Sequence, residues 1–234
     1  MSSNKDQLVT AKNLSKTYPR KKGPLIKALD GISLDVFRGE FLSIIGHSGS
    51  GKTTLLNLVG ALDRPTSGEI FFEGKNLASL SPFHLAALRR QKIGFIFQTF
   101  NLIPSLTVRE NVESALVHSG MERAEIDRKV ITLFEDLKLV NLWDRFPLEL
   151  SAGQQQKVAI ARAIVKEPIL ILADEPTGEM DPTAGKEILE KLIELNRKSK
   201  ITVIFASHGI SSSESDRTIF IDNGRLVSQK EAGY

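Results

Sequence analysis

A glycine-rich segment in the first quarter of the chain constrains the fold more than any other feature. Residues 46–53 read Gly-His-Ser-Gly-Ser-Gly-Lys-Thr, which matches the pattern G-x-x-x-x-G-K-[ST] at every fixed position. The apolar run at 41–45 predicts a buried strand before it, and residues 52–62 show the apolar spacing of a helix after it. A strand, a glycine-rich turn and a helix in this order predict a phosphate-binding loop in an α/β fold.

The residue types in this loop suit a nucleotide phosphate chain and its magnesium ion. Glycines let the backbone curl so that successive N–H groups point at phosphate oxygens, and the following helix adds the positive end of its dipole. We expect Lys52 to reach the β- and γ-phosphates and the Thr53 hydroxyl to coordinate Mg²⁺. The loop residues expected to contact nucleotide are Gly46, His47, Ser48, Gly49, Ser50, Gly51, Lys52, Thr53 and Thr54.

A second apolar strand ends in two carboxylates. Residues 169–175 read Ile-Leu-Ile-Leu-Ala-Asp-Glu, and ligands of open α/β sheets lie beyond the carboxyl ends of the strands. We assign Asp174 to the metal and Glu175, which can turn toward the nucleotide as the strand ends, to the activation of an attacking water. An acidic strand end by itself is common on protein surfaces, so its pairing with a phosphate loop favours the functional interpretation.

Apolar strands alternate with helices along the rest of the chain, which predicts a parallel sheet covered by helices. Further strands are predicted at 8–14, 25–37, 69–72, 93–97, 201–206 and, as two short segments, within 217–228. Helical spacing is found at 82–91, over 107–142, at 151–166 and from about 181 onward, where Asp181 precedes Pro182 as a cap.

Composition excludes several classes of protein. The 234 residues include no cysteine, which excludes a disulfide framework and a thiolate zinc cluster. A net charge of +3 is too small to indicate nucleic-acid binding. No signal peptide opens the sequence, and no run approaches the roughly 20 apolar residues of a membrane span, so a membrane role would require a partner. A basic cluster is interpreted as a solvated loop, with a phosphate- or lipid-facing patch as the alternative: Lys16, Arg20, Lys21 and Lys22.

A third motif lies between the phosphate loop and the acidic strand. Residues 150–154 read Leu-Ser-Ala-Gly-Gln and open a predicted helix. The motif resembles the LSGGQ signature of ABC ATPases, which few other P-loop proteins carry, and it precedes the acidic strand as in that family. The resemblance implies that the start of this helix, itself an anion site, binds the γ-phosphate of a partner subunit's nucleotide. The residues concerned are Ser151, Ala152, Gly153 and Gln154.

Other residues match the ABC pattern along almost the whole chain. The resemblance implies that Tyr18 stacks on adenine, that Gln98 touches the metal or its water, and that His208 contacts the γ-phosphate. A loop tyrosine, a strand-end glutamine and a structural histidine are the ordinary alternatives. The resemblance also places Asp181 in a loop that communicates across a dimer. Ala152 replaces a family glycine, which is tolerable only if its φ is negative and the partner's phosphate leaves room for the methyl group.

The resemblance implies an α/β P-loop NTPase fold of ABC type, with a mixed-sheet core, an antiparallel β subdomain and an inserted α-helical subdomain. We expect residues 1–234 to form one ABC ATPase domain. Residues 1–97 and 167–234 would form the RecA-like core with the antiparallel subdomain, and residues 98–166 the helical subdomain. Glu175 and His208 would serve catalysis, with ATP and Mg²⁺ as cofactors. The expected assembly is a dimer of identical or paired subunits.

Two stretches, 97–112 and 177–189, look like the branch of lipoprotein-release, macrolide-efflux and cell-division ATPases. In that branch a cytoplasmic dimer on the inner face of the cell membrane drives a few-helix transmembrane partner, whereas other ABC proteins serve a many-helix permease. The expected function is therefore ATP-driven export, extrusion or mechanotransmission, with no nucleic-acid partner. Four apolar residues suit either a docking surface for a partner's helix or packing within the subdomain: Phe100, Leu102, Ile103 and Leu106.

Two alternatives remain open. A soluble ABC ATPase of DNA repair or translation would carry long coiled-coil inserts or two ATPase domains in one chain, and neither is found in this sequence. A nucleotide-binding regulator without turnover would lack the base, whereas Glu175 and His208 are both present.

Overall fold

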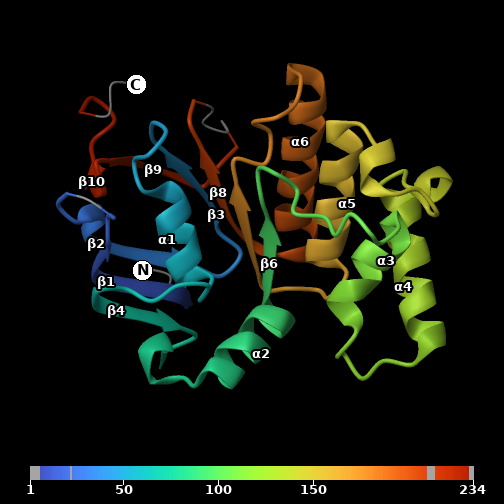
Figure 1. Ribbon diagram of the computed structural model, residues 1–234, viewed down its shortest axis with the longest axis horizontal. Coiled ribbons are helices and arrows are strands. Elements are labelled where there is room, and N and C mark those ends of the chain that lie inside the picture. The colour runs from blue at the N-terminus through green and yellow to red at the C-terminus, as the bar shows by residue number, and fades with distance from the viewer. Residues whose placement is uncertain (1–5, 22, 210–213, 232–234) are drawn as a thin grey trace, which may run out of the picture.

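The computed structural model describes residues 6–21, 23–209 and 214–231, and its strands form two sheets (Figure 1). The larger sheet has the order β10-β9-β3-β8-β7-β6, and every neighbouring pair is parallel except β9–β10. The prediction of a parallel sheet is thus confirmed for five of its strands. The strands are β3 (Phe41–Ile45), β6 (Ile93–Ile96), β7 (Leu170–Asp174), β8 (Thr202–Ser207), β9 (Arg217–Asp222) and β10 (Arg225–Val227).

The smaller sheet is antiparallel, with the order β2-β1-β4-β5. Its first strand continues beyond the predicted residue 14 and includes Lys16, whose ammonium pairs with Asp63 at 2.7 Å while only 13% of the side chain is exposed. The solvated-loop interpretation is therefore wrong for Lys16. Arg20 and Lys21 are exposed, which fits both the solvated loop and the alternative patch, and Lys22 lies outside the described residues. The strands are β1 (Gln7–Tyr18), β2 (Ile26–Phe37), β4 (Ser67–Phe72) and β5 (Lys75–Asn76).

The helices lie where the sequence predicts them, with one subdivision. The stretch 107–142, where helical spacing was predicted, forms two α-helices separated by a 3-10 turn at Ser114–Leu116 and by Gly120, whose φ is +76°. In Figure 1, α3, α4 and α5 gather on the side away from the smaller sheet. The helices are α1 (Lys52–Val59), α2 (Pro82–Lys92), α3 (Val108–Glu113), α4 (Arg123–Asp136), α5 (Ala152–Ile164) and α6 (Pro182–Ser199).

The larger sheet is buried on both faces, which explains its continuous apolar strands. In β7, Leu170 and Leu172 pack into the cluster beneath α1 and the smaller sheet, whereas Ile171 and Ala173 pack against α5 and α6. Adjacent strand residues point to opposite faces, so one short strand contributes to both cores. This packing fixes the carboxyl ends of the strands, where the functional residues begin. None of the helices within the described ranges is long and apolar enough to cross a membrane.

Candidate active site

The register of the larger sheet brings the predicted motifs to one edge. Ile45 pairs with Ser207 and Asp174 pairs with Ala206, so β3, β8 and β7 end at the same level. The phosphate loop, His208 and Glu175 are the segments that follow those three ends. Gln98 follows β6 at the same edge, because Ile96 pairs with Ala173.

Lys52 is the most enclosed charged group of the phosphate loop. Its side chain is 4% exposed, and its ammonium donates hydrogen bonds to the carbonyl oxygens of Gly46 at 2.7 Å and His47 at 3.1 Å. The loop wraps around the charge, so the lysine is held in place by the backbone it follows. The exposed residues of the loop are His47, Ser48, Gly49 and Thr53. Ser50 is buried, and Gly51 and Thr54 are half-buried.

Two glycines are required by the geometry of the loop. A Cβ at Gly46 would lie 2.2 Å from the carbonyl oxygen of Ile221, and Gly51 has a φ of +111° at the start of α1. A third glycine, Gly224 of the β9–β10 turn, donates its N–H to the carbonyl of Ser50 at 2.9 Å. The curled loop is thus packed against distant segments and does not depend on its own turns alone.

Glu175 connects the motifs at the strand ends. Its carboxylate lies 3.1 Å from the Lys52 ammonium through Oε1 and 2.6 Å from Nδ1 of His208 through Oε2. Its backbone has a φ of 45°, in the left-handed region that a residue with a side chain rarely adopts. This backbone turn directs the side chain toward the loop, as the sequence predicted. The carboxylate thereby joins a phosphate-binding lysine and a histidine, two of the groups that phosphoryl transfer needs.

Asp174 has the properties of a metal ligand. Its Oδ1 is buried and accepts no hydrogen bond from any residue that the structure describes. Burial raises the pKa of this carboxyl, the Thr53 hydroxyl opposes that rise, and the neighbouring charge of Glu175 adds to it. The described residues contain no group of three or more acidic or histidine side chains that could hold a metal. A single carboxylate beside a threonine hydroxyl fits Mg²⁺, which binds through one or two protein oxygens together with phosphates and waters.

Tyr18 ends β1 beside α1. Its hydroxyl donates to Asp63 at 2.8 Å, and the ammonium of Lys16 lies 4.9 Å from the ring centroid. Burial and the carboxylate of Asp63 raise the pKa of Tyr18, while the Thr54 side chain lowers it. The aromatic ring is thus fixed next to the phosphate loop, which suits the predicted contact with adenine. That contact stays a prediction.

The signature residues begin α5 and form no hydrogen bond with the phosphate loop in the described part of the chain. Ser151 caps the helix by accepting from the N–H of Gln154 at 3.3 Å, and Gln154 accepts from the N–H of Ser151 at 2.9 Å. Ala152 is in the first helical turn and is not among the positive-φ residues, so the first condition for its methyl group is met. A Cβ at Gly153 would make only ordinary contact, 3.5 Å from Ala184.

The loop after β7 carries the remaining predicted residues. Asp181 caps α6 by accepting from the N–H groups of Thr183 at 3.0 Å and Ala184 at 3.1 Å, which confirms its predicted capping role. Gln98 donates to Glu179 of the same loop at 2.9 Å. Gln98 is thus joined to the segment that follows Glu175, and its contact with a metal stays a prediction.

Comparison with known proteins decides the family. The sequence profile described as "ABC transporter" matches residues 29–178. The chain belongs to the ABC transporter family. The ATP-binding protein MJ0796 of Methanocaldococcus jannaschii is 43% identical over 232 residues, which cover 96% of this chain and 97% of that protein. A dimeric structure of MJ0796 in a post-hydrolysis state, bound to ADP and Pi, has a TM-score of 0.88 at 39% identity and covers 94% of this chain and 97% of that one.

A longer relative adds a membrane context. The pyoverdine export ATP-binding/permease protein PvdT of Pseudomonas fluorescens is 41% identical over 221 residues, which cover 94% of this chain and 34% of PvdT. The chain thus spans about a third of that relative. As an ABC cassette it binds and hydrolyses ATP with Mg²⁺ and dimerises. The predicted resemblance to ABC ATPases is thereby confirmed.

Two side chains of this ABC cassette were missed by the motif analysis. Gln156 is completely buried and donates to the carbonyl of Pro176 at 2.7 Å, and Arg162 donates to the carbonyl of Phe100 at 2.8 Å. Both reach from α5 to a loop at the strand ends. The sequence did carry a signal for Gln156. This polar residue shares a helix face with the apolar Ala159 and Ile160, and such a face is expected to be buried, as it is here.

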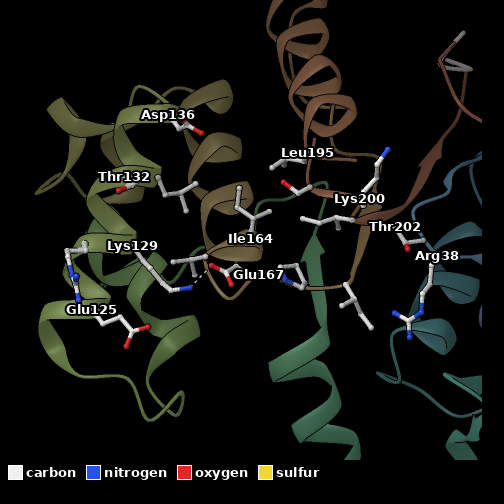
Figure 2. Close-up of a pocket in the computed structure, with 17 residues that line it drawn as sticks. Arg38, Glu125, Lys129, Thr132, Asp136, Ile164, Glu167, Leu195, Lys200 and Thr202 are labelled. Atoms are coloured by element: carbon white, nitrogen blue, oxygen red, sulfur yellow. Dashed lines mark hydrogen bonds and ion pairs between the residues drawn. The ribbon is translucent and has the colours of Figure 1, made fainter. Parts of the chain in front are cut away.

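The cassette also contains a cleft that lies away from the predicted site residues. This cleft has a volume of about 940 Å³ and lies between α4 and the end of α5 on one side and the end of α6 on the other. Figure 2 shows the side chains that line it. Its lining includes Thr202, where β8 begins, and Ile169, just before β7. It therefore opens at the amino ends of the parallel strands, whereas the predicted motifs lie at the carboxyl ends. A search guided by the size of this cleft would have selected the opposite edge of the sheet.

Proposed function

We propose that the chain is the ATP-hydrolysing motor of a membrane machine for export, extrusion or mechanotransmission. The resemblance of residues 97–112 and 177–189 to the lipoprotein-release, macrolide-efflux and cell-division branch supports this function. The similarity to PvdT, whose name describes an export ATP-binding/permease protein, supports it as well. In this proposal the cassette lies in the cytoplasm on the inner face of the membrane. It is attached there through a few-helix partner or a permease, with no nucleic acid involved.

The observation that carries the proposal is the contact of Glu175 with both Lys52 and His208 at one edge of the sheet. Lys52 binds the β- and γ-phosphates, Asp174 and Thr53 hold Mg²⁺, and Glu175 accepts a proton from the attacking water. His208, held by Glu175, contacts the γ-phosphate. The loop from Gly46 to Thr54 surrounds the phosphates, Tyr18 stacks on adenine, and Gln98 reaches the metal or its water.

A second cassette completes each site in this proposal. The N-terminus of α5, with Ser151, Ala152, Gly153 and Gln154, faces the γ-phosphate bound by the partner, because a helix start favours an anion. Asp181 lies in the loop between the two sites. The dimeric ADP- and Pi-bound structure of MJ0796 supports this arrangement. The pair consists of identical chains or of two related ABC subunits.

The membrane partner docks on the helical subdomain, which we place at residues 98–166, with residues 1–97 and 167–234 as the core. The N–H of Val108 donates to the carbonyl of Arg145 at 2.8 Å, so the loop after Gln98 runs beside the segment 143–149. Between them these segments expose Ile103 by 42%, Phe146 by 44% and Leu148 by 89%. Phe100, Leu102 and Leu106 are half-buried, so only Ile103 of the four predicted residues is largely free for docking.

The decisive experiment compares phosphate release by the wild type and by Glu175→Gln. Replacing the base with a neutral isostere should lower kcat by about 100-fold or more, because general base catalysis contributes roughly 10²–10⁴-fold. Glu190→Gln is the matched control, since that carboxylate is 62% exposed on α6, and it should turn over like the wild type. Equal rates for the wild type and Glu175→Gln would refute the assigned base.

The same variant identifies the partner. Glu175→Gln should hold the ATP-bound dimer together, so it is recovered from native membranes with Mg-ATP and analysed by mass spectrometry. A co-purified protein with few transmembrane helices and a large external domain supports extrusion or mechanotransmission. A many-helix permease supports transport by another branch. Recovery of ribosomal or DNA-associated proteins alone would favour the soluble class of ABC ATPase and contradict the proposal.

A further inference from the structure

Gln156 is a buried polar side chain on a helix face that otherwise packs into the core. It lies in the second turn of α5 and is 0% exposed, whereas the neighbouring Gln155 and Lys157 are half-buried. Its Nε2 donates to the carbonyl of Pro176 at 2.7 Å, and its Oε1 is buried without a hydrogen-bond partner among the described residues. Leaving a buried acceptor unpaired costs about 1–3 kcal/mol, so the amide is not explained by stability alone.

The carbonyl that Gln156 holds belongs to the residue directly after the base. The N–H of Glu175 donates to the carbonyl of Ala206 at 2.9 Å, which fixes the entry to the turn from β8. The carbonyl of Glu175 accepts from the N–H of Gly178 at 3.0 Å, which closes the turn. The contact from Gln156 to Pro176 is a side-chain hydrogen bond from α5 to the same turn. Three hydrogen bonds therefore hold the turn in which Glu175 has a φ of 45°.

A left-handed φ persists only where the surroundings enforce it. If the Pro176 carbonyl loses its donor, the peptide plane between Pro176 and Thr177 can rotate, and the turn that enforces the left-handed backbone of Glu175 loses one of its hydrogen bonds. The carboxylate would then move away from Lys52 and His208, which lie 3.1 Å and 2.6 Å from its oxygens. Displacements of about 1 Å at reacting groups lower rates by roughly 100-fold. The hydrogen bond from Gln156 to the Pro176 carbonyl can thus control the position of the Glu175 carboxylate.

The same helix begins at the signature. Ser151 and Gln156 are five residues apart, which is about 7.5 Å along one rigid helix. Figure 1 shows α5 between α6 and the α3–α4 pair, so it is supported on both sides. A displacement of the α5 N-terminus should therefore move the Pro176 carbonyl by a similar distance.

We propose that Gln156 is a positioning residue, which ties the signature helix to the Glu175 turn and holds the base in its catalytic orientation. The inference rests on the proposed function, in which Glu175 is the base and Ser151 faces the partner's nucleotide. Gln156 touches neither substrate nor metal in this scheme. It makes the orientation of the base in one site depend on the helix that closes the other site.

The test uses Gln156→Met, which keeps the length of the side chain and removes the donor. Gln155→Met is the matched control, since the Gln155 amide donates to the Leu150 carbonyl at 3.2 Å and not to the Glu175 turn. Steady-state ATP hydrolysis by the full chain should show kcat lowered at least tenfold by Gln156→Met, with KM within about twofold of the wild type. Gln155→Met should change kcat by less than about twofold. Equal kcat values for the two variants would overturn the proposal.

Epistasis separates a positioning role from a general loss of structure. If Gln156 acts through Glu175, the double variant with Glu175→Gln should hydrolyse ATP at the rate of Glu175→Gln alone. A further tenfold loss in the double variant would overturn the proposal. Gln156→Asn, which keeps an amide one methylene too short, provides the same readout if the methionine variant is insoluble. Glu175→Gln turning over at the wild-type rate would instead refute the proposed function.

Discussion

Two helices of the cassette begin at predicted anion sites, and their first turns are built in opposite ways. α1 follows Gly51, which has a φ of +111° and no side chain to accept from the free N–H groups. α5 follows Ser151, whose hydroxyl accepts from Gln154 while Gln154 accepts in return. One helix start is left open toward the loop it closes, and the other is closed by its own side chains.

The difference indicates two modes of binding. At α1 the N–H groups, the curled loop and Lys52 are in place before an anion arrives, so little reorganisation is required. At α5 the backbone N–H groups of Ser151 and Gln154 are already bonded to side-chain acceptors and must exchange those partners before they bind a phosphate. The first site is suited to tight capture of nucleotide. The second is suited to a contact that forms and breaks in every cycle.

The largest effect is expected at the open helix start. Lys52→Ala should lower ATP hydrolysis by about 100-fold or more, because a preorganised charge at the transferred phosphate contributes roughly 10²–10³-fold. Lys186→Ala, on the exposed face of α6, is the control and should leave the rate unchanged. Nucleotide binding and turnover are measured on the same preparations. Turnover within twofold of the wild type for Lys52→Ala would remove the contrast between the helix starts.

A smaller effect is expected at the closed helix start. Ser151→Ala should raise by about tenfold the ATP concentration needed for dimerisation of Glu175→Gln, since a hydrogen bond to a charged group is worth about 1.5–3 kcal/mol. Losing the cap should also lower Tm by about 2–4 °C. Ser81→Ala removes the matching cap of α2 and should lower Tm without affecting dimerisation, as measured by size-exclusion chromatography. Equal dimerisation of both variants would assign Ser151 a capping role only.

The smallest effect concerns the opposite end of α5. Burial, together with the neighbouring charge of Arg162, lowers the pKa of Lys166 to about 8 from its ordinary 10.5. Above pH 8 the folded state releases a proton that the unfolded state keeps, so the free energy of unfolding should rise toward pH 10.5. The rise should be roughly 1 kcal/mol, given the partial exposure of the side chain. Urea unfolding of the wild type and Lys166→Met should diverge over this range, and parallel pH curves would contradict the shift.

Elements with strong local signals were predictable from the sequence. The apolar run 41–45, the glycine pattern at 46–53 and the Asp181–Pro182 cap each specify local backbone by their own chemistry. The helical spacing over 107–142 predicted helix there but not its division into α3 and α4. Apolar periodicity does not reveal a break at Gly120, because the segments on both sides of it pack into the same core. The length of β1 was also missed, since its outer half is fixed by pairing with β2 and not by apolar alternation.

Motifs predicted the residues of the site better than their contacts. The types and order of Lys52, Asp174, Glu175 and His208 were readable because each corresponds to a known chemical task. The contact of Glu175 with both Lys52 and His208 depends on strand register, which local sequence does not encode. The tie from Gln156 to Pro176 depends on the packing of α5 against the sheet, so no motif could reveal it.

The hydrogen bond from Gly224 to Ser50 has a consequence for the biogenesis of the protein. The carbonyl of Gly224 also accepts from the N–H of Asp30 at 2.8 Å, so the turn after β9 joins two segments made much earlier in translation. A ribosome-bound chain that has emerged only through α6 contains every phosphate-loop residue but lacks this clamp. Nucleotide would therefore stabilise the chain only after β9 and β10 have been made, rather than guide its early folding. Acquisition of ATP affinity during synthesis would mark the moment when the β9–β10 turn closes over the loop.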